Sequence, residues 1–283
     1  MPENRQEIFW DTEGMKVIIS HDVDHLYGRD HWFRDLIYPK LWVRSLLSAF
    51  SGKISWKECR LRIRSCFQRE RNHILEVMDF DEAHGVPSTF FFGMNQALGM
   101  SYRPEEAREM IRKVHERGFA AGVHGVVYND SEGIRKEYDS FVRTAGFEPA
   151  GIRMHYVRTE EGTFEKEAAA GYVFDSSEFD KEKHGTVKAP YRVGRMWEFP
   201  LALMDVYLTE DREAAREETV RRFAECRKAG LSYVTVLFHD PHFDEAYLAY
   251  RDWYVWLIES IAASAQDSFV SFEDAVRELE SAK

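Results

Sequence analysis

The segment Ser20-His21-Asp22-Val23-Asp24-His25 gathers residue types that are suited to metal binding and acid–base chemistry. Its two aspartates are two residues apart, so their side chains share a face if the preceding strand continues through them. One carboxylate of such a pair can hold a metal ion while the other stays free to accept a proton. The apolar, β-branched run that precedes the segment predicts a strand, which places the aspartates at its carboxyl end.

Three later apolar runs also stop at a histidine, namely His124, His155 and His239. Histidine is a common metal ligand and a common general acid or base. A single histidine at the end of a strand is more often structural than catalytic. Four strand ends that each carry a histidine or an aspartate rarely arise by chance, so the pattern predicts one shared site.

The strand ends alternate with stretches of helical spacing along the whole chain. Strands are expected at 17–19, 89–92, 120–124, 151–156, 172–174, 197–207, 233–238 and 269–270, and helices at 103–118, 131–146, 159–171, 210–230 and 244–265. Such alternation predicts an α/β fold with a parallel sheet. We expect one domain over residues 1–283, an irregular seven-stranded (β/α) barrel, with an open doubly wound sheet as the competing architecture. In both folds the chemistry lies at the carboxyl ends of the strands.

One region, at about residues 26–60, interrupts this alternation directly after the first strand. It is rich in aromatic and aliphatic residues with basic residues interleaved, which predicts a helical insertion packed on the barrel. A lid, a subunit interface and peripheral membrane contact through residues 32–50 are the functional alternatives.

The composition narrows the class of protein. The chain has 283 residues, 44% of them hydrophobic, with a net charge of −11, which fits a globular domain and argues against a nucleic-acid partner. The three cysteines are too few and scattered for a disulfide framework. Residues 1–12 are polar and lack the apolar core of a signal peptide, so we expect a cytoplasmic location. No signal in the sequence indicates the oligomeric state.

The strand-end motifs, taken in order, resemble those of the polysaccharide deacetylase family, the metal-dependent carbohydrate esterases. The resemblance extends from about residue 17 to residue 272. It rests on the spaced aspartates and His124, and on the following segments: Ser88 to Phe92, Arg153-Met154-His155-Tyr156, Gly171 to Ser177, Glu198 to Leu201 and Leu237-Phe238-His239.

The resemblance implies a division of roles among these residues. Asp22 would be the general base, His239 the general acid, and Arg153 the residue that braces Asp22. Asp24 and His124 would bind a divalent metal, with zinc expected and cobalt or nickel as alternatives. We expect Tyr156, His155 and Asp175 on the substrate side, and an N-acetylated carbohydrate, in surface glycan or O-antigen synthesis, as the substrate.

The chain departs from the family pattern at the second motif. A further metal histidine usually stands four residues after the first, and Tyr128 occupies that position here. A catalytic zinc site normally has three protein ligands. We therefore expect His25 to be the third ligand, with His155 as the next choice. Two other functions remain open: an amidohydrolase for a small or cyclic amide, and a barrel that binds glycan without catalysis.

Overall fold

A curled parallel sheet forms the centre of the molecule. The computed structural model describes residues 14–282 apart from 29–31, 33–35, 69–71 and 101. The strands are β1 (Lys16–Val23), β2 (Thr89–Gly93), β3 (Ala120–Gly125), β4 (Ile152–Met154), β5 (Phe174–Asp175), β6 (Tyr191–Val193), β7 (Met196–Glu198), β8 (Leu201–Met204), β9 (Tyr233–Leu237) and β10 (Ser268–Phe269).

The strand order is β6-β7-β5-β4-β3-β2-β1-β9-β8, and β10 pairs with the beginning of β1. All pairs are parallel except the β6–β7 hairpin. Only Phe199 and Pro200 separate β7 from β8, yet β7 pairs with β5 and β8 pairs with β9. This one extended run therefore connects the two ends of the curled sheet.

The expected barrel architecture is confirmed, although the strand count differs. The sheet has ten strands rather than seven. Seven positions remain around the curl if β7 and β8 count as one run and the hairpin strand β6 and the short β10 are set aside. The hairpin was not predicted, because its strand at residues 191–193 is partly exposed and lacks an apolar run.

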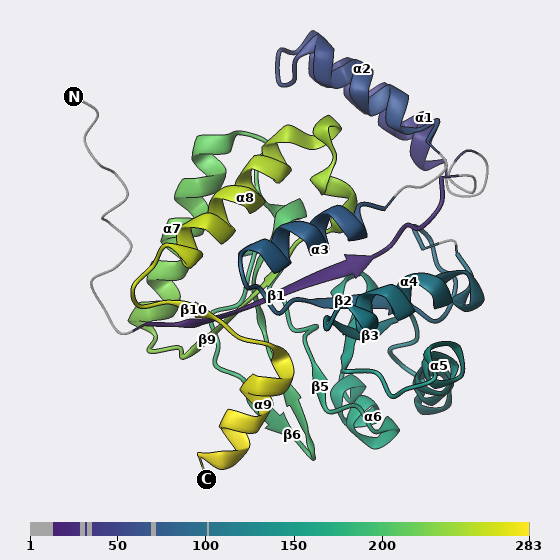
Figure 1. The fold of residues 1–283 in the computed structure, drawn as a ribbon, viewed down its shortest axis with the longest axis vertical. Coiled ribbons are helices and arrows are strands. Elements are labelled where there is room, and N and C mark those ends of the chain that lie inside the picture. Colours follow the sequence, from purple (N-terminus) through teal and green to yellow (C-terminus); the bar gives the residue numbers. More distant parts are fainter. Residues whose placement is uncertain (1–13, 29–31, 33–35, 69–71, 101, 283) are drawn as a thin grey trace.

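The helices that the structure describes are α1 (Ile37–Phe50), α2 (Trp56–Ser65), α3 (Ile74–Ala83), α4 (Pro104–Glu116), α5 (Ser131–Ala145), α6 (Thr163–Ala170), α7 (Arg212–Lys228), α8 (Leu248–Ala262) and α9 (Phe272–Ser281). Helices α3 to α8 lie around the sheet, whereas α1 and α2 lie apart from it (Figure 1). Local signals set the ends of the helices. Asp130 accepts hydrogen bonds from the first turn of α5, and Gly146 ends that helix with φ of 83°.

The interior of the curl is filled by large apolar side chains. Ile18, Phe91, Phe174 and Phe199 are fully buried there, and Phe272 of α9 packs among them. Phe174 and Phe272 stack with their ring centroids 4.3 Å apart. The barrel is therefore a packed core beneath its carboxyl edge rather than a channel.

The expected insertion contains a helical hairpin, α1 and α2, which lies at the periphery of the molecule beyond the carboxyl end of β1 (Figure 1). Residues 29–31 and 33–35 of the predicted insertion, and residues 1–12 on which the expected location rests, lie outside the described residues. Among the helices that the structure describes, none is both long and apolar enough to span a bilayer.

Candidate active site

The four strand ends meet at the carboxyl edge of the sheet, as predicted. Asp22 lies near the end of β1 and Asp24 follows that strand, His124 lies on β3, and His239 follows β9. Together with His155, which follows β4, they line one cleft with a volume of about 690 Å³. The parallel register explains this convergence, because neighbouring strands run in the same direction and end at the same edge.

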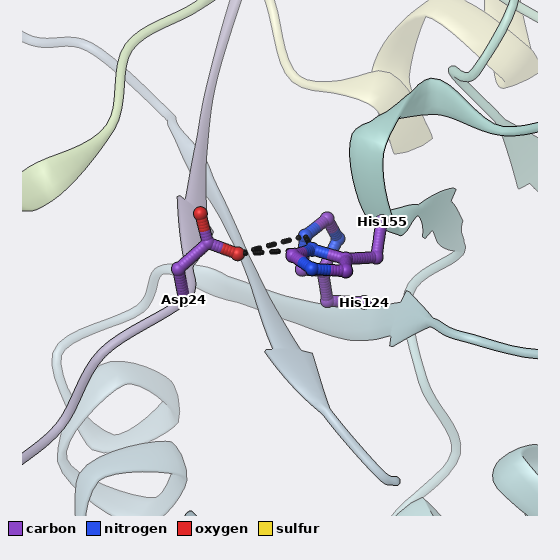
Figure 2. A group of neighbouring side chains, drawn as sticks. All are labelled: Asp24, His124 and His155. Atoms are coloured by element: carbon purple, nitrogen blue, oxygen red, sulfur yellow. Dashed lines mark hydrogen bonds and ion pairs between the residues drawn. The ribbon is translucent and has the colours of Figure 1, made fainter. Parts of the chain in front are cut away.

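Asp24, His124 and His155 form a triangle of possible metal ligands (Figure 2). Asp24 Oδ1 is 3.3 Å from His124 Nε2 and 3.1 Å from His155 Nδ1, and the two nitrogens are 3.1 Å apart. Ligand atoms at about 2.0–2.1 Å from a tetrahedral zinc ion are about 3.3 Å from one another. The spacing of the three atoms therefore fits a zinc-sized ion.

Hydrogen bonds on the far side of each ring orient these imidazoles. His124 Nδ1 is 3.0 Å from the carbonyl oxygen of Arg153, and His155 Nε2 is 2.9 Å from that of Leu98. A carbonyl only accepts, so these nitrogens donate and each ring's lone pair faces Asp24. Asp24 Oδ1 is buried and accepts no hydrogen bond. A bound cation would accept the two converging lone pairs and would also satisfy this carboxylate oxygen.

The pKa shifts of the triangle residues are consistent with the binding of a cation. Burial would raise the pKa of the Asp24 carboxyl, but His124 and His155 outweigh burial and hold that pKa well below its usual range. Burial would likewise lower the pKa of His124, but Asp22 and Asp24 outweigh it and raise that pKa. The buried site thus favours positive charge, which a divalent ion can supply in place of an imidazole proton.

The geometry favours His155 over His25 as the third ligand. His155 joins the triangle, whereas His25 lines the cleft outside it. His25 directly follows Asp24, but it does not belong to the group of converging ligand atoms. Tyr128, at the position of the missing family histidine, lies beside Arg158, whose guanidinium is 5.6 Å from the centre of its ring. His155 was predicted to face the substrate and is reassigned to the ligand group.

Asp22 lies next to the triangle and is held by Arg153. Arg153 Nη1 donates to Ser20 Oγ at 2.8 Å and lies 3.3 Å from Asp22 Oδ1, while Arg153 Nε donates to the carbonyl of Ser176 at 2.6 Å. Arg153 is fully buried and Asp22 lines the cleft. Arg153 is therefore a positioning residue, and Asp22 is the carboxylate that can reach a substrate.

Loss of the Arg153 charge is expected to destabilise the fold. Arg153→Met would leave Asp22 and its buried acidic neighbours Asp175 and Glu198 without their counter-charge, which costs about 3–5 kcal/mol for a broken buried pair. Urea unfolding measures this effect. Arg112→Met is the control, because Arg112 pairs with Glu116 on the surface and should change stability by less than about 1 kcal/mol. Equal effects of the two substitutions would contradict the buried-charge role.

A second carboxylate–histidine group lies at the same cleft, which its two histidines line. Asp205, which follows β8 and is fully buried, lies 2.6 Å from His239 Nδ1 and 2.7 Å from His242 Nδ1. Those lengths are hydrogen bonds and leave no room for an ion between the atoms. Sequence reasoning missed Asp205, although it ends an apolar run just as the other site residues do.

The Asp205 contact sets the charge of His239. Burial opposes the imidazolium, but the charge of Asp205 and its hydrogen bond outweigh burial and raise the pKa of His239 to about 10. His239 Nε2 lies 3.9 Å from Asp24 Oδ2, so its second nitrogen faces the triangle. His239 thus has a raised pKa and lines the same cleft as Asp22, as the general acid of an amide hydrolysis requires.

Asp205→Asn is expected to lower the upper pH limit of activity. A general acid works only while protonated, so the alkaline limb of kcat should follow the His239 pKa. Removing the carboxylate charge lowers that pKa from about 10, and the limb moves to lower pH. A kcat profile between pH 6 and pH 11 checks the shift. An unchanged limb would show that His239 is not the acid or that Asp205 does not set its charge.

Two residues predicted to face the substrate differ in their placement. Tyr156 lines the cleft and is half exposed, and its hydroxyl donates to the carbonyl of Leu98 at 3.0 Å. Tyr156 and Val157 both have positive φ, at 59° and 44°, which costs non-glycine residues about 1–3 kcal/mol each and is typical of functional turns. This turn directly follows His155.

Asp175 cannot contact a substrate, contrary to the prediction, because it is fully buried. Its Oδ1 accepts the hydroxyl of Ser177 at 2.6 Å. Burial and the charge of Asp175 raise the pKa of Glu198 well above its usual range, so these two carboxyls are expected to share a proton. Asp175 contributes to the buried charge around Arg153 beneath the site.

The curled sheet with its cluster at the carboxyl edge has the polysaccharide deacetylase fold. A structure from Mycobacterium smegmatis, provisionally assigned as a polysaccharide deacetylase, matches with a TM-score of 0.64, 17% identity and coverage of 96% of this chain and 92% of that chain. One from Pseudomonas aeruginosa PAO1 with a similarly provisional assignment matches with a TM-score of 0.60, 13% identity and coverage of 95% and 91%.

An allantoinase, PuuE, shares the fold to a similar degree. Its TM-score is 0.60, with 15% identity and coverage of 95% of this chain and 90% of that chain. No protein-family model and no curated protein sequence matches the chain. At these identities the likeness establishes the fold, and the chemistry has to be argued from the site.

Proposed function

We propose that this protein is a metal-dependent hydrolase that removes the acetyl group from an N-acetylated sugar. The observation that carries the proposal is the arrangement of three functions in one cleft: a metal-type triangle, a carboxylate beside it, and a histidine with a raised pKa. Amide hydrolysis needs a base for the attacking water and an acid for the leaving amine, and these groups supply both.

The residues divide the work as follows. Asp22, held by Arg153, accepts the proton of the attacking water. His239, charged through Asp205, donates its Nε2 proton to the leaving nitrogen. Asp24, His124 and His155 would hold the divalent ion. When bound, that ion lowers the pKa of a coordinated water and polarises the amide carbonyl.

Two kinds of observation support a sugar substrate. The strand-end motifs resemble those of the polysaccharide deacetylases, and two solved structures with provisional assignments to that activity share the fold. An open cleft of about 690 Å³, with Tyr156 and Tyr207 among its lining residues, is large enough for one or two sugar rings and offers aromatic faces for them. Synthesis of a surface glycan is the proposed setting.

Hydrolysis of a cyclic amide is the second candidate, because an allantoinase shares the fold to nearly the same degree. The test incubates the zinc- or cobalt-loaded protein with N-acetylglucosamine oligomers and, separately, with allantoin and cyclic imides. Release of acetate from the oligomers supports the proposal. Ring opening without acetate release would favour the second candidate. A protein that loads no metal and hydrolyses neither would contradict both candidates and leave the glycan-binding barrel as the remaining alternative.

A further inference from the structure

The outward side of α1 is apolar. Val43, Leu46, Leu47 and Phe50 follow the i, i+3, i+4, i+7 spacing of one helix face, which normally packs inward. Here Leu47 is 63% exposed and Phe50 is 76% exposed. Trp56 at the beginning of α2 is 53% exposed and meets Phe50 edge to face at 5.1 Å. We call these five side chains the apolar face of the hairpin.

The exposed charge of the hairpin is positive. Every residue of segment 36–68 is described, and its exposed charged side chains are all basic: Lys40, Arg44, Lys53, Lys57, Arg60 and Arg64. The one acidic residue of the segment, Glu58, is buried. The chain as a whole carries a net charge of −11, so the hairpin differs in sign from the rest of the protein.

The hairpin is fixed to the barrel rather than loosely attached. Arg62 of α2 is buried, and its guanidinium donates to Glu58 and Glu210, both at 2.9 Å. Its Nε donates to the carbonyl of Ala246 at 2.9 Å. This basic side chain is therefore neutralised internally, and it anchors the hairpin to the segments that hold Glu210 and Ala246.

We propose that the hairpin docks this protein on an anionic phospholipid surface, with the apolar face inserted among the lipids and the exposed bases at the headgroups. An amphipathic helix with bulky apolar residues on one side and bases around them binds such a surface through buried apolar area and charge attraction. The Debye length at physiological salt is about 8 Å, so the acidic remainder of the protein is screened from the membrane.

A second copy of the chain fits this surface less well. In a symmetric dimer the same patch meets itself, so the basic residues of two hairpins would face one another. Like charges across an interface are unfavourable. An anionic bilayer instead complements both the apolar face and the bases, and on the expected cytoplasmic location the inner leaflet supplies that charge.

The proposal has a consequence for access to the active site. Ile37 and Arg44 of α1 line the cleft that contains Asp24 and His239. The helix that would lie on the lipid is therefore also a wall of the cleft. It follows, on the proposed function, that acylated sugars attached to lipid in the same surface can enter directly. Docking itself does not depend on that function.

The test measures sedimentation with vesicles made of phosphatidylglycerol and phosphatidylcholine, and with vesicles of phosphatidylcholine alone. We expect the full-length protein to bind the anionic vesicles and to be released by high salt. Leu47→Ser/Phe50→Ser should weaken binding by about 10-fold or more, since two large apolar side chains lose their buried area. Lys53→Ala/Lys57→Ala should weaken it by roughly 5-fold for each charge removed.

Matched controls change the same residue types elsewhere. Leu75→Ser/Val173→Ser removes two exposed apolar residues outside the hairpin, and Arg112→Ala/Lys136→Ala removes two exposed bases there. Both control variants should bind as the wild-type protein does. The hairpin variants should keep the wild-type melting temperature and the wild-type rate on soluble substrates, which separates this proposal from the proposed function.

Three outcomes would overturn the docking proposal. The first is no binding to anionic vesicles. The second is equal binding to neutral vesicles, or equal loss in control and hairpin variants. The third is a dimer in sedimentation velocity that Leu47→Ser/Phe50→Ser dissociates, in a protein that does not bind vesicles, which would assign the apolar face to a second copy instead.

Discussion

His155→Ala is expected to remove both the bound metal and the hydrolytic activity, whereas His25→Ala keeps both. His155 Nδ1 is 3.1 Å from Asp24 Oδ1, and the other ring nitrogen of His155 is bound to the carbonyl of Leu98. The lone pair of Nδ1 therefore points toward Asp24. Loss of a partner that only orients a ligand typically costs 10–100-fold in metal affinity, and loss of a ligand should cost more than about 100-fold.

Metal content per chain after dialysis, together with the rate of acetate release, checks this prediction. His25→Ala is the matched control, since both histidines line the same cleft and only one lies in the triangle. If His25→Ala lost the metal and His155→Ala kept it, the ligand choice made from sequence would be right and the geometric assignment wrong.

The second large effect is expected for Asp22→Asn, which should abolish hydrolysis while the metal stays bound. Asparagine keeps the shape of the side chain but cannot take the proton of the attacking water. Removal of a general base typically costs about 10²–10⁴-fold in rate. Asp22 Oδ2 is 3.8 Å from His124 Nε2, and the triangle forms without it, so metal affinity should change little.

Single-turnover rates on metal-loaded wild-type and Asp22→Asn protein measure this effect, and metal titration of the same samples separates the two roles. Equal loss of metal and activity would make Asp22 a ligand instead of the base. Asp24→Asn is the matched comparison, because the same chemical change two residues away should release the metal.

Much of the fold followed from simple patterns in the chain. Apolar runs such as 233–238 and 120–124 predicted strands that the structure contains, and Gly146 marked the end of a helix correctly. The split of run 197–207 into β7 and β8 was not predictable. Pairing with β5 on one side and β9 on the other depends on the curl of the whole sheet, which local spacing does not encode.

In the site, too, the features set by local sequence were predicted and those set by long-range contacts were not. Residues at strand ends were predicted to converge, because parallel strands end at one edge, and Asp22, Asp24, His124 and His239 do so. The sequence and the geometry favour different third ligands, because proximity in sequence favoured His25, whereas the end of β4 brings His155 into the triangle.

One omission and one misplaced residue have physical causes as well. Asp205 carried the same signal as the other site residues, an acidic residue at the end of an apolar run, but its partner His239 is 34 residues away. Asp175 was placed on the substrate side, but it is buried beneath the site together with Glu198. Neither contact can be read from spacing alone.

The most direct test of the central claim is a crystal of the zinc-soaked protein measured with X-rays at the zinc absorption edge. The account predicts one anomalous peak at about 2.0–2.2 Å from Asp24, His124 Nε2 and His155 Nδ1. A peak at the Asp205, His239 and His242 group, or a triangle that remains empty at saturating zinc, would contradict it.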